Sequence, residues 1–512
     1  MLLLGCANIA GLLLSKAAGR KQEIAIRHSL GAKTGRLMRQ LLTESLLLAA
    51  AGGVAGLILA NFGIEMLRVH SPDLVGSTEL GLNTKVLAYL AAVAILTGLL
   101  FGLAPALSAG QQTTTLLRQR GGARSRHFQN ALVAGQVALA LVLLTGAGLL
   151  AASLGNLAAA NPGFQVERVL TMEYRLARDK YATASKASIH QQIAARVGAV
   201  PGVESAALVG ALPFSGNANR ILLALPDRPE SVAVGYNPVS PGYFNTAGVA
   251  LLEGRDFSLA DGANSEAVAV VNRTFADRFW PGRDVLGHQV RVSTGAAAFT
   301  PATIVGIVGD VKQYALDDTS EPQLYRPYAQ DPYAFATLVV RTKDDPLALA
   351  NSVKQAIWSV ERNQSVWKVR TLEYLVDRSY SYLRCITWTT ACFAALALLL
   401  AAIGLYGLLS YAVTQRRSEL GIRMAVGASP ADVLRLVVRD GLVLTAIGIV
   451  AGIACALVLT VFLRSQMYEV TTTEPRVYAG VTLVLLIVAL LAVWFPARRA
   501  MRVDPMDALR PE

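Results

Sequence analysis

The chain has 512 residues, of which 53% are hydrophobic and only 16% are charged, and its mean hydropathy is +0.44. Soluble proteins carry about 25% charged residues, so this composition excludes an ordinary soluble protein and predicts a membrane protein. The formal net charge of +12 fits either nucleic-acid binding or membrane orientation, and the positions of the basic residues distinguish the two.

The chain opens on a short apolar run, Leu2–Leu14, that ends before the basic residue Lys16. A transmembrane helix needs roughly 20 apolar residues, so this run is too short to be a complete span. A signal peptide is a poor alternative, because no basic residue precedes the run and no small-residue cleavage site follows it. We expect the run to be the lower half of a span whose upstream part is absent from this sequence.

Six later apolar runs are long enough to cross a bilayer. They lie at 42–64, 86–107, 131–153, 386–412, 436–463 and 478–496. Short loops with an excess of lysine and arginine stay in the cytoplasm, which places the basic loop after the first run, and the basic loop 108–130, inside. The loops 65–85 and 464–477 have nearly balanced charges, and we place them outside.

One topology satisfies all of these loops. It places residues 154–384 outside the cytoplasm, and the C-terminal tail with Arg498, Arg499 and Arg502 inside. The net charge then follows from membrane orientation and contact with anionic lipid, so membrane lipid is an expected partner and nucleic acid is not. The expected fold is an α-helical transmembrane bundle, with six full spans and a partial first one, and an extracytoplasmic α+β domain.

Residues 20–60 and 416–456 form an internal repeat. Aligned without a gap, at an offset of 396, the two segments are identical at 15 of 41 positions. The identities include Arg20/Arg416, Glu23/Glu419, Ile26/Ile422, Arg27/Arg423, Gly31/Gly427, Ala32/Ala428, Gly52/Gly448 and Gly56/Gly452. Each copy joins a charged helical segment to a long apolar run, so the repeated unit is a surface helix followed by a membrane span.

The charged segment of each copy has the features of a docking surface. Glu23 precedes Arg27, and Glu419 precedes Arg423, by four residues, which is the favourable order for a helical ion pair. An interfacial helix that only turns the chain is the alternative, but the polar pattern is kept twice, which favours docking of two equivalent cytoplasmic subunits. The candidate docking residues are Glu23, Ile24, Arg27, Gly31, Ala32, Glu419, Leu420, Arg423, Gly427 and Ala428.

Residues 160–380 are the part of the sequence outside the membrane that is long enough for a core of its own. Strand-like runs such as AALVGAL, EAVAVVN and ATLVVRT alternate with helical stretches near 183–199, 272–280 and 346–361. This alternation predicts an α+β domain. Frequent Pro-Gly and Asp-Pro turn signals divide it into many short elements, which suggests two small lobes.

No catalytic, metal or cofactor site is expected. The four cysteines lie in or beside the predicted spans, and the five histidines are scattered without the spacing of metal ligands. The segment Gly31-Ala32-Lys33-Thr34 resembles the end of a phosphate-binding loop, but it lacks the glycine directly before the lysine. We therefore expect a non-catalytic chain with no ATP site of its own.

Several sequence blocks resemble those of one family of membrane proteins. They are the repeated segments QEIAIR and SELGIRMAVGA, the closing segment Phe495–Glu512, and the outer blocks Val239–Phe257, Val270–Gly282 and Ile304–Tyr314. In this order they resemble the FtsX-like and MacB-type permeases of ABC transporters, in the long duplicated version. The resemblance implies that short cytoplasmic helices contact a separate ATPase dimer, and that the outer domain is a MacB-like periplasmic core.

The resemblance also implies a domain plan. Residues 1–110 correspond to the end of a first FtsX-like transmembrane domain, 111–130 to a basic cytoplasmic linker, 131–153 to the helix that opens the second half, 154–384 to the periplasmic core, and 385–512 to the second transmembrane domain with its cytoplasmic tail. In the duplicated version each half has one span, a periplasmic core and three further spans, so we expect the first span and first core to be missing. The chain is then expected to form a homodimer or to complement a missing N-terminal half.

Layout and resemblance together predict a permease of the bacterial inner membrane that works by mechanotransmission. Few ionisable residues lie inside the predicted spans, which disfavours a polar path through the bilayer. We expect a separate ATPase to move the periplasmic domain, for export or efflux of a peptide, lipid-linked or drug-like substrate, with a periplasmic adaptor or outer-membrane channel as a further partner. The alternative is a non-transporting regulator that activates a periplasmic partner such as a cell-wall hydrolase.

Overall fold

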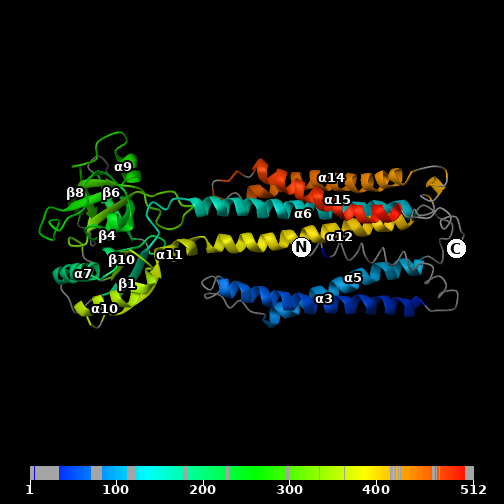
Figure 1. Ribbon diagram of the computed structural model, residues 1–512, viewed down its shortest axis with the longest axis horizontal. Coiled ribbons are helices and arrows are strands. Elements are labelled where there is room, and N and C mark those ends of the chain that lie inside the picture. The colour runs from blue at the N-terminus through cyan, green and yellow to red at the C-terminus, as the bar shows by residue number, and fades with distance from the viewer. Residues whose placement is uncertain are drawn as a thin grey trace. The chain divides into compact units, whose positions relative to one another are not determined.

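The computed structural model of the chain is drawn in Figure 1 and divides into two compact units. The helical unit combines Met1–Asn156 with Leu383–Glu512, and the sheet domain is Leu157–Tyr382. The structure describes residues 5, 34–70, 83–111, 121–176, 183–217, 219–225, 230–293, 299–331, 333, 335–362, 364–415, 419, 422–424, 426, 429–463, 467–468, 470–471 and 473–501. Apart from Gly5, the apolar run Leu2–Leu14 lies outside these residues, and the boundaries of the predicted domain plan stay predictions.

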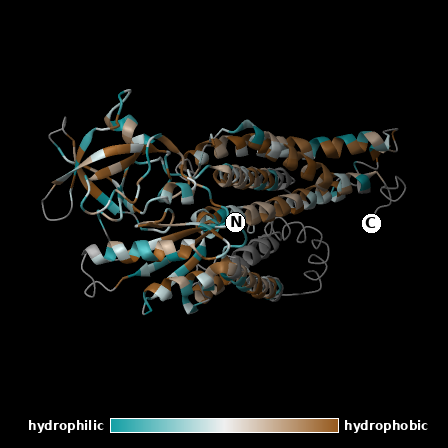
Figure 2. Ribbon diagram, turned by 60° about the vertical axis from the view of Figure 1, so that its left-hand side comes forward, coloured by the Kyte–Doolittle hydropathy of each residue, from teal (hydrophilic) through white to brown (hydrophobic). Residues whose placement is uncertain are grey.

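Six long helices make up the described part of the helical unit. They are α3 (Thr34–His70), α5 (Thr84–Gln111), α6 (Gly121–Ala159), α12 (Ser381–Gln415), α14 (Pro430–Leu463) and α15 (Pro475–Ala500). Among the described residues, five helical segments have the length and composition of membrane spans: Leu46–Met66, Gln129–Ala159, Ser381–Gln415, Pro430–Phe462 and Pro475–Arg498. Apolar residues cover most of these helices in Figure 2, and five of the six predicted spans are confirmed.

The sixth predicted span, 86–107, falls on α5. The segment is helical throughout Thr84–Gln111, and its apolar stretch among the described side chains is Thr84–Leu96. That stretch is shorter than the roughly 20 residues that cross a bilayer. The helix is confirmed, and its passage through the membrane stays a prediction.

Helices α6, α12, α14 and α15 share one apolar core. Its buried side chains are Val137, Ala140 and Leu141 of α6, Ala397 and Ala401 of α12, Ile449 and Ala456 of α14, and Leu485 of α15. Lipid tails are as apolar as these side chains, so the hydrophobic effect gives little drive for such helices to associate. Close packing of small and aliphatic residues holds them together instead.

Two glycines bring the backbones of α6 and α14 into contact. A Cβ added at Gly448 would lie 2.7 Å from the Cβ of Val137 and 2.8 Å from the carbonyl oxygen of Ala134. A Cβ added at Gly452 would lie 2.9 Å from both the carbonyl oxygen of Ala138 and the Cβ of Leu141. Gly448 and Gly452, which are four residues apart, therefore form a flat surface on α14 against which the backbone of α6 packs.

We expect Gly448→Ala to lower the stability of the helical unit. Its new methyl group would overlap α6, and overpacking of this kind costs about 1–3 kcal/mol. The matched control is Gly480→Ala on α15, because a Cβ at Gly480 has no atom within 4 Å and alanine is the better helix former by about 1 kcal/mol. In thermal unfolding of the purified chain in detergent, the midpoint temperature should fall for Gly448→Ala and rise for Gly480→Ala. Equal shifts of the midpoint would contradict the close packing of α14 against α6.

Helices α3 and α5 pack against each other. The contact includes Gly53, at which an added Cβ would lie 4.0 Å from the Cβ of Ala94 on α5. The remaining surface of α3 is exposed along much of its length, including the large side chains of Leu48, Leu59 and Phe62. Through the internal repeat α3 corresponds to α14, which packs against α15.

The sheet domain has eleven strands and several short helices. The strands are β1 (Val169–Arg175), β2 (Val203–Val209), β3 (Asn219–Ala224), β4 (Val232–Val239), β5 (Leu251–Gly254), β6 (Val268–Asn272), β7 (Gln289–Ser293), β8 (Phe299–Val308), β9 (Gln323–Pro327), β10 (Phe335–Thr342) and β11 (Val366–Thr371). The helices are α7 (Thr183–Gly198), α8 (Tyr243–Ala247), α9 (Arg273–Phe279), η2 (Leu347–Leu349), α10 (Ala350–Val360) and α11 (Leu372–Ser379). The expected α+β fold is confirmed, as are the helices near 183–199, 272–280 and 346–361.

The strand order divides the sheet domain into a ring and a wing. The order is β11-β1-β10-β2-β4-β3-β7-β8-β6-β9, and β4 also pairs in parallel with β9. This last pairing closes β4, β3, β7, β8, β6 and β9 into a ring, while β5 attaches to β8. Strands β2, β10, β1 and β11 extend from the ring as the wing, which carries α7 and α10.

Each of these two parts has its own hydrophobic core. The ring encloses the aromatic side chains of Phe275, Phe279 and Trp280 together with valines and isoleucines of its strands. The wing packs Ile193 of α7 and Ile357 of α10 against the buried face of β1 and β10. Two cores of this kind agree with the two lobes expected from the sequence.

One polar cluster is buried in the wing. His190 of α7 is only 1% exposed, and its Nδ1 lies 2.7 Å from the hydroxyl of Tyr174. Its Nε2 lies 2.8 Å from the carbonyl oxygen of Tyr333. A neutral ring satisfies both contacts, because Nε2–H donates to the carbonyl and Nδ1 accepts from the tyrosine. Burial lowers the pKa of His190 to about 4, because the charged ring loses its hydration.

We expect the sheet domain to lose stability as the pH falls from about 6.5 to about 4. In this window the unfolded chain protonates His190, whose ordinary pKa is about 6.5, while the folded domain keeps it neutral. The unfolded state therefore binds more protons, and unfolding becomes easier by up to about 3 kcal/mol. Hydrogen exchange of the β1 and β10 amides in the full chain, corrected for intrinsic exchange rates, measures this change.

The pH dependence should depend on His190 itself. His190→Gln is expected to lower stability at pH 7 but to flatten the change between pH 6.5 and 4, because glutamine does not titrate. His288→Gln is the matched control, since it makes the same substitution at an exposed histidine of the same domain. An unchanged slope in His190→Gln would assign the effect to other groups.

Candidate functional site

The second copy of the predicted docking segment carries an ion pair on its surface. Arg423 Nη2 lies 2.8 Å from Glu419 Oε1, and the side chains of Arg423 and Glu419 are 55% and 48% exposed. The two residues stand four apart with the acid first, as the sequence pattern predicts. An exposed pair of this kind contributes only about 0.3–0.5 kcal/mol to stability, so the fold depends little on it.

Two apolar side chains extend the same surface. Ile422 is 50% exposed and Val426 is 83% exposed, and both follow Glu419 at helical spacings of three and seven residues. The amide of Val426 donates to the carbonyl oxygen of Ile422 at 3.0 Å, which keeps this stretch in a helical turn. We call Glu419, Ile422, Arg423 and Val426 the docking patch, a mixture of charged and apolar groups typical of a protein contact.

Sequence reasoning did not select Val426. A signal was present, because Val426 aligns with Leu30 in the internal repeat and an apolar residue therefore occupies this position in both copies. Its exposure could not be inferred, since an apolar residue in a helical segment is more often buried.

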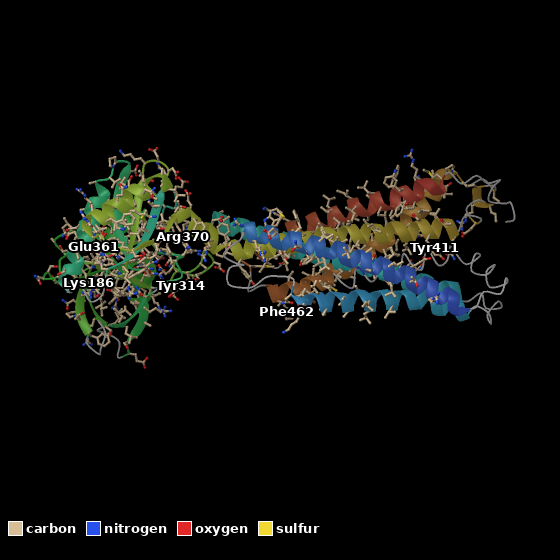
Figure 3. The ribbon with its side chains drawn as sticks, turned by 90° about the horizontal axis from the view of Figure 1, so that it is seen from below. Lys186, Tyr314, Glu361, Arg370, Tyr411 and Phe462 are labelled. Carbon is tan, nitrogen blue, oxygen red and sulfur yellow. The ribbon has the colours of Figure 1, made fainter. Side chains whose placement is uncertain are left out.

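The opposite side of the segment is anchored to the bundle. Met424 packs against a small cluster that contains Val433 and Val437 of α14 and Ala497 of α15. The segment is thereby held at the end of the helical unit while the docking patch stays exposed. Tyr411, near the same end of α12, is labelled in Figure 3.

A capping box begins α14 directly after the docking patch. The hydroxyl of Ser429 donates to Asp432 Oδ2 at 2.6 Å, the amide of Ser429 donates to the same oxygen at 3.1 Å, and the amide of Asp432 donates back to Ser429 Oγ at 3.3 Å. Pro430 occupies the first helical position, where its missing N–H costs nothing. This cap fixes the point at which the chain turns from the docking patch into the span.

The remaining predicted docking residues lie outside the described part of the chain. They are Glu23, Ile24, Arg27, Gly31 and Ala32 of the first copy, and Leu420, Gly427 and Ala428 of the second. The described residues thus bring Glu419 and Arg423 together, and the docking roles of all ten residues stay predictions.

The outer sequence blocks Val270–Gly282 and Ile304–Tyr314 meet in one buried hydrogen-bond network. Asn272 is fully buried, and its side-chain amide donates to Asp310 Oδ1 at 2.7 Å and to the carbonyl oxygen of Glu321 at 2.9 Å. Its oxygen accepts from the amides of Phe275 and Gln323 at 3.1 and 2.8 Å. Asn272 therefore caps α9 and joins three strands, which gives these blocks a structural role.

The block Val239–Phe257 ends in a second such feature. Both terminal nitrogens of Arg255 donate to the carboxylate of Asp261, at 2.8 and 2.9 Å, and the amide of Ser258 donates to the same group at 2.8 Å. The hydrogen bonds from Arg255 hold the pKa of Asp261 below its ordinary value. The pair closes the loop after β5 and contains no group poised for proton transfer.

The part of the chain that the structure describes offers no candidate metal site in either unit. No three histidine, cysteine or acidic side chains lie close enough there to hold a metal ion.

Two family models match the chain and together cover most of it. The model of the FtsX-like permease C-terminal region matches residues 1–114 and 391–505. The model of the MacB-like periplasmic core domain matches residues 131–356. The first of these models covers both copies of the internal repeat, and the second covers most of the sheet domain.

Curated relatives match about half of the chain. The chain is 27% identical to the pyoverdine export ATP-binding/permease protein of Pseudomonas syringae pv. syringae. This match extends over 282 residues, which make up 53% of this chain and 41% of that protein. The chain is 26% identical over 298 residues to the macrolide export ATP-binding/permease protein of Escherichia coli K12, covering 55% and 44% of the two. The match thus spans less than half the length of these relatives.

Solved structures also resemble the chain. The periplasmic region of MacB from Actinobacillus actinomycetemcomitans matches at 14% identity and a TM-score of 0.30, over 42% of this chain and 92% of that one. The extracellular domain of the ABC-type transporter YknZ from Gram-positive bacteria matches at 14% identity and a TM-score of 0.28, over 39% and 100%. On the two family models, the chain belongs to the FtsX-like and MacB-type permeases of ABC transporters, as a multi-pass membrane protein with a MacB-like periplasmic core domain.

Proposed function

We propose that this chain is the permease of an ABC exporter, in which a separate ATPase moves the periplasmic core domain by pushing on the docking patch. The observation that carries this proposal is the patch itself, where a paired Glu419 and Arg423 stand beside exposed Ile422 and Val426. Exposure of these two apolar side chains to water is unfavourable unless a partner covers them. Relatives named as ATP-binding/permease proteins indicate what that partner is.

The connection between patch and periplasmic domain is a single helix. Helix α12 begins at Ser381, directly after α11 of the periplasmic domain, and ends at Gln415, four residues before Glu419. Its 35 residues correspond to a length of roughly 50 Å. A continuous helix of this length transmits a displacement at one end to the other, which supports mechanotransmission.

ATP hydrolysis is assigned to the partner. The 512 residues contain no Gly-x-x-x-x-Gly-Lys-Ser/Thr segment, which a phosphate-binding loop of this class requires. An ATPase dimer would contact the docking patch with Leu420, Gly427 and Ala428 on one side. It would contact the matching first-copy residues Glu23, Ile24, Arg27, Gly31 and Ala32 on the other.

The substrate is proposed to leave by way of the periplasmic domain. Relatives are named for export of pyoverdine and of macrolides, which favours the drug-like end of the expected substrate range. A periplasmic adaptor or outer-membrane channel would then receive the substrate. Membrane lipid surrounds the exposed apolar side chains of the spans, such as Phe462 in Figure 3, which is 79% exposed.

We expect Glu419→Lys to reduce stimulation of the partner ATPase while leaving the permease folded. The substitution removes an exposed ion pair worth about 0.3–0.5 kcal/mol, which is too little to unfold the bundle, and it reverses a charge of the docking patch. Stimulation of ATP hydrolysis and thermal unfolding are measured on the same reconstituted samples. Glu230→Lys, at an exposed position of the periplasmic domain, is the matched charge reversal and should change neither.

A charge-swapped double variant separates docking from helix stability. Glu419→Arg combined with Arg423→Glu restores an intrahelical pair but exchanges the two charges on the patch. We expect stimulation of the partner ATPase to stay low in this variant. Recovery of this stimulation would show that the ion pair acts only by stabilising the helix, which is the role expected of an interfacial helix that turns the chain.

Val426→Ser tests the apolar part of the patch. Because Val426 is 83% exposed, the change should leave stability within about 0.5 kcal/mol but weaken ATPase binding, since apolar anchors dominate protein contacts. Leu259→Ser is the matched control, as Leu259 is 74% exposed on the periplasmic domain. The measurement is the affinity of the purified ATPase for each reconstituted permease. Equal affinities for the wild type, Val426→Ser and Leu259→Ser would show that Val426 does not lie in the interface.

A further inference from the structure

One arginine of the sheet domain is buried in the ring. Arg326 lies on β9, where it is paired with Pro238 of β4, and it is only 5% exposed. It stands two residues after Leu324, so the two side chains point to the same face of the strand. Leu324 belongs to the hydrophobic core of the ring. The guanidinium group of Arg326 therefore lies on the side of β9 that faces this core.

No described group of the chain compensates the charge of Arg326. Its Nε atom is buried and has no hydrogen-bond partner. The ion pairs among the described residues of the sheet domain involve other basic side chains, namely Arg220, Arg255, Arg273 and Lys368. Arginine keeps its proton in a protein, and a buried charge without a partner is strongly unfavourable. Arg326 therefore has the properties of a group that binds an anion from outside the chain.

Two tyrosines and one acidic residue lie near the guanidinium group. The hydroxyl of Tyr236 donates to Oδ2 of Asp331, and the ring centroids of Tyr236 and Tyr333 are 6.5 Å apart. Burial raises the pKa of both tyrosines and the charge of Asp331 raises it further, whereas the charge of Arg326 acts in the opposite direction. Arg326 and Asp331 thus both act on the two hydroxyl groups, but Asp331 is engaged by Tyr236.

The cluster reaches the surface at Tyr333. This side chain is 38% exposed, whereas Tyr236 is 3% exposed. The carbonyl oxygen of Tyr333 lies 2.8 Å from Nε2 of His190, and this hydrogen bond ties the backbone at Tyr333 to the wing. A molecule that arrives from the aqueous side therefore meets an aromatic ring on an anchored backbone, next to a buried positive charge.

These surroundings favour a carboxylate with a single negative charge. The planar guanidinium group can donate two parallel hydrogen bonds to a carboxylate, and one negative charge balances Arg326. A phosphate group carries more negative charge at neutral pH, and the neighbouring Asp331 would repel it. The exposed ring of Tyr333 favours a flat apolar body attached to the carboxylate, because aromatic rings pack favourably against one another.

We propose that Arg326 and Tyr333 form a binding site for the carboxylate group of a small aromatic anion outside the cytoplasm. Arg326 donates to the carboxylate, and the ring of Tyr333 covers the body of the ligand. Tyr236 acts as a positioning residue, because its hydrogen bond holds Asp331 and leaves the guanidinium group available. The site lies within the sheet domain and does not depend on the docking patch.

Benzoate is the simplest probe of this site. The full chain is purified in detergent, and binding is measured by saturation-transfer NMR against the concentration of benzoate. We expect saturable binding. Benzamide, which has the same ring and no charge, and inorganic phosphate should each bind about tenfold more weakly or worse, because charge-assisted hydrogen bonds to a carboxylate are the stronger ones. The sample contains no ATPase, so the result is independent of the proposed coupling.

Arg326→Met removes the guanidinium group and keeps an unbranched side chain. Because the charge has no partner among the described residues, its replacement by an apolar side chain should leave the unfolding midpoint of the domain equal or higher. Benzoate binding should fall about tenfold or more, and benzoate should raise the midpoint of the wild type but not of this variant. Arg291→Met makes the same change at an exposed arginine of β7 and should bind benzoate like the wild type.

The opposite results would overturn the proposal. Equal binding of benzoate and benzamide would reduce the site to a contact with the ring, and a preference for phosphate would make it a general anion site. Unchanged benzoate binding in Arg326→Met would place the probe elsewhere. A lower midpoint of Arg326→Met without ligand, or no saturable binding to the wild type, would mean that the chain itself or water already compensates the charge.

Discussion

Close backbone contact between membrane helices is the constraint on which the helical unit depends. A bilayer offers no hydrophobic drive for apolar helices to associate, so the contact must come from surface shape. Gly448 and Gly452 provide a flat surface for the backbone of α6, and Gly404 of α12 leaves room for the side chain of Gln136 on α6. The remaining helix, α15, packs against α14 where Gly441 faces Val493. The bundle is thus assembled around positions that lack side chains.

The periplasmic domain is under a different constraint, because it lies in water and the edge strands of a sheet have unpaired backbone groups. Exposed edges invite pairing with other chains, and the parallel pairing of β4 with β9 removes two of them by closing the ring. Pro238 stands inside β4, where a proline would normally break a sheet. It is tolerated because the pairing with β3 ends at Tyr236 and β2 meets β4 only at Val239.

Much of this architecture could be predicted from the sequence because periodicity and charge report it directly. Long apolar runs and basic loops predicted the spans, and short strand-like runs predicted β2, β6 and β10. Strands such as β9, with the sequence QLYRP, have no alternation to detect, since they are buried on both faces. The closure of the ring depends on β4 and β9, which are more than 80 residues apart, and no local pattern encodes such a pairing.

The candidate site was only partly predictable for a similar reason. The pairing of Glu419 with Arg423 follows from helical spacing alone, and the structure has it at 2.8 Å. The exposure of Val426 depends instead on how Met424 is anchored against α14 and α15, which is a tertiary contact. The burial of His190 between Tyr174 and Tyr333 is equally invisible in the sequence, where a single histidine carries no signal.

The two copies of the repeat have the same Glu, Arg, Gly and Ala at four of the five aligned docking positions, but they differ directly after them. The second copy begins its span with the capping box of Ser429 and Asp432, whereas the aligned residues of the first copy are Lys33 and Arg36, whose side chains contain no oxygen that could accept the capping hydrogen bonds. The capping residues thus differ between the copies, while the Glu-x-x-x-Arg spacing, which stabilises a helix only a little, is the same in both. This combination supports the proposal that the shared residues contact a partner and do not serve mainly to stabilise the helix.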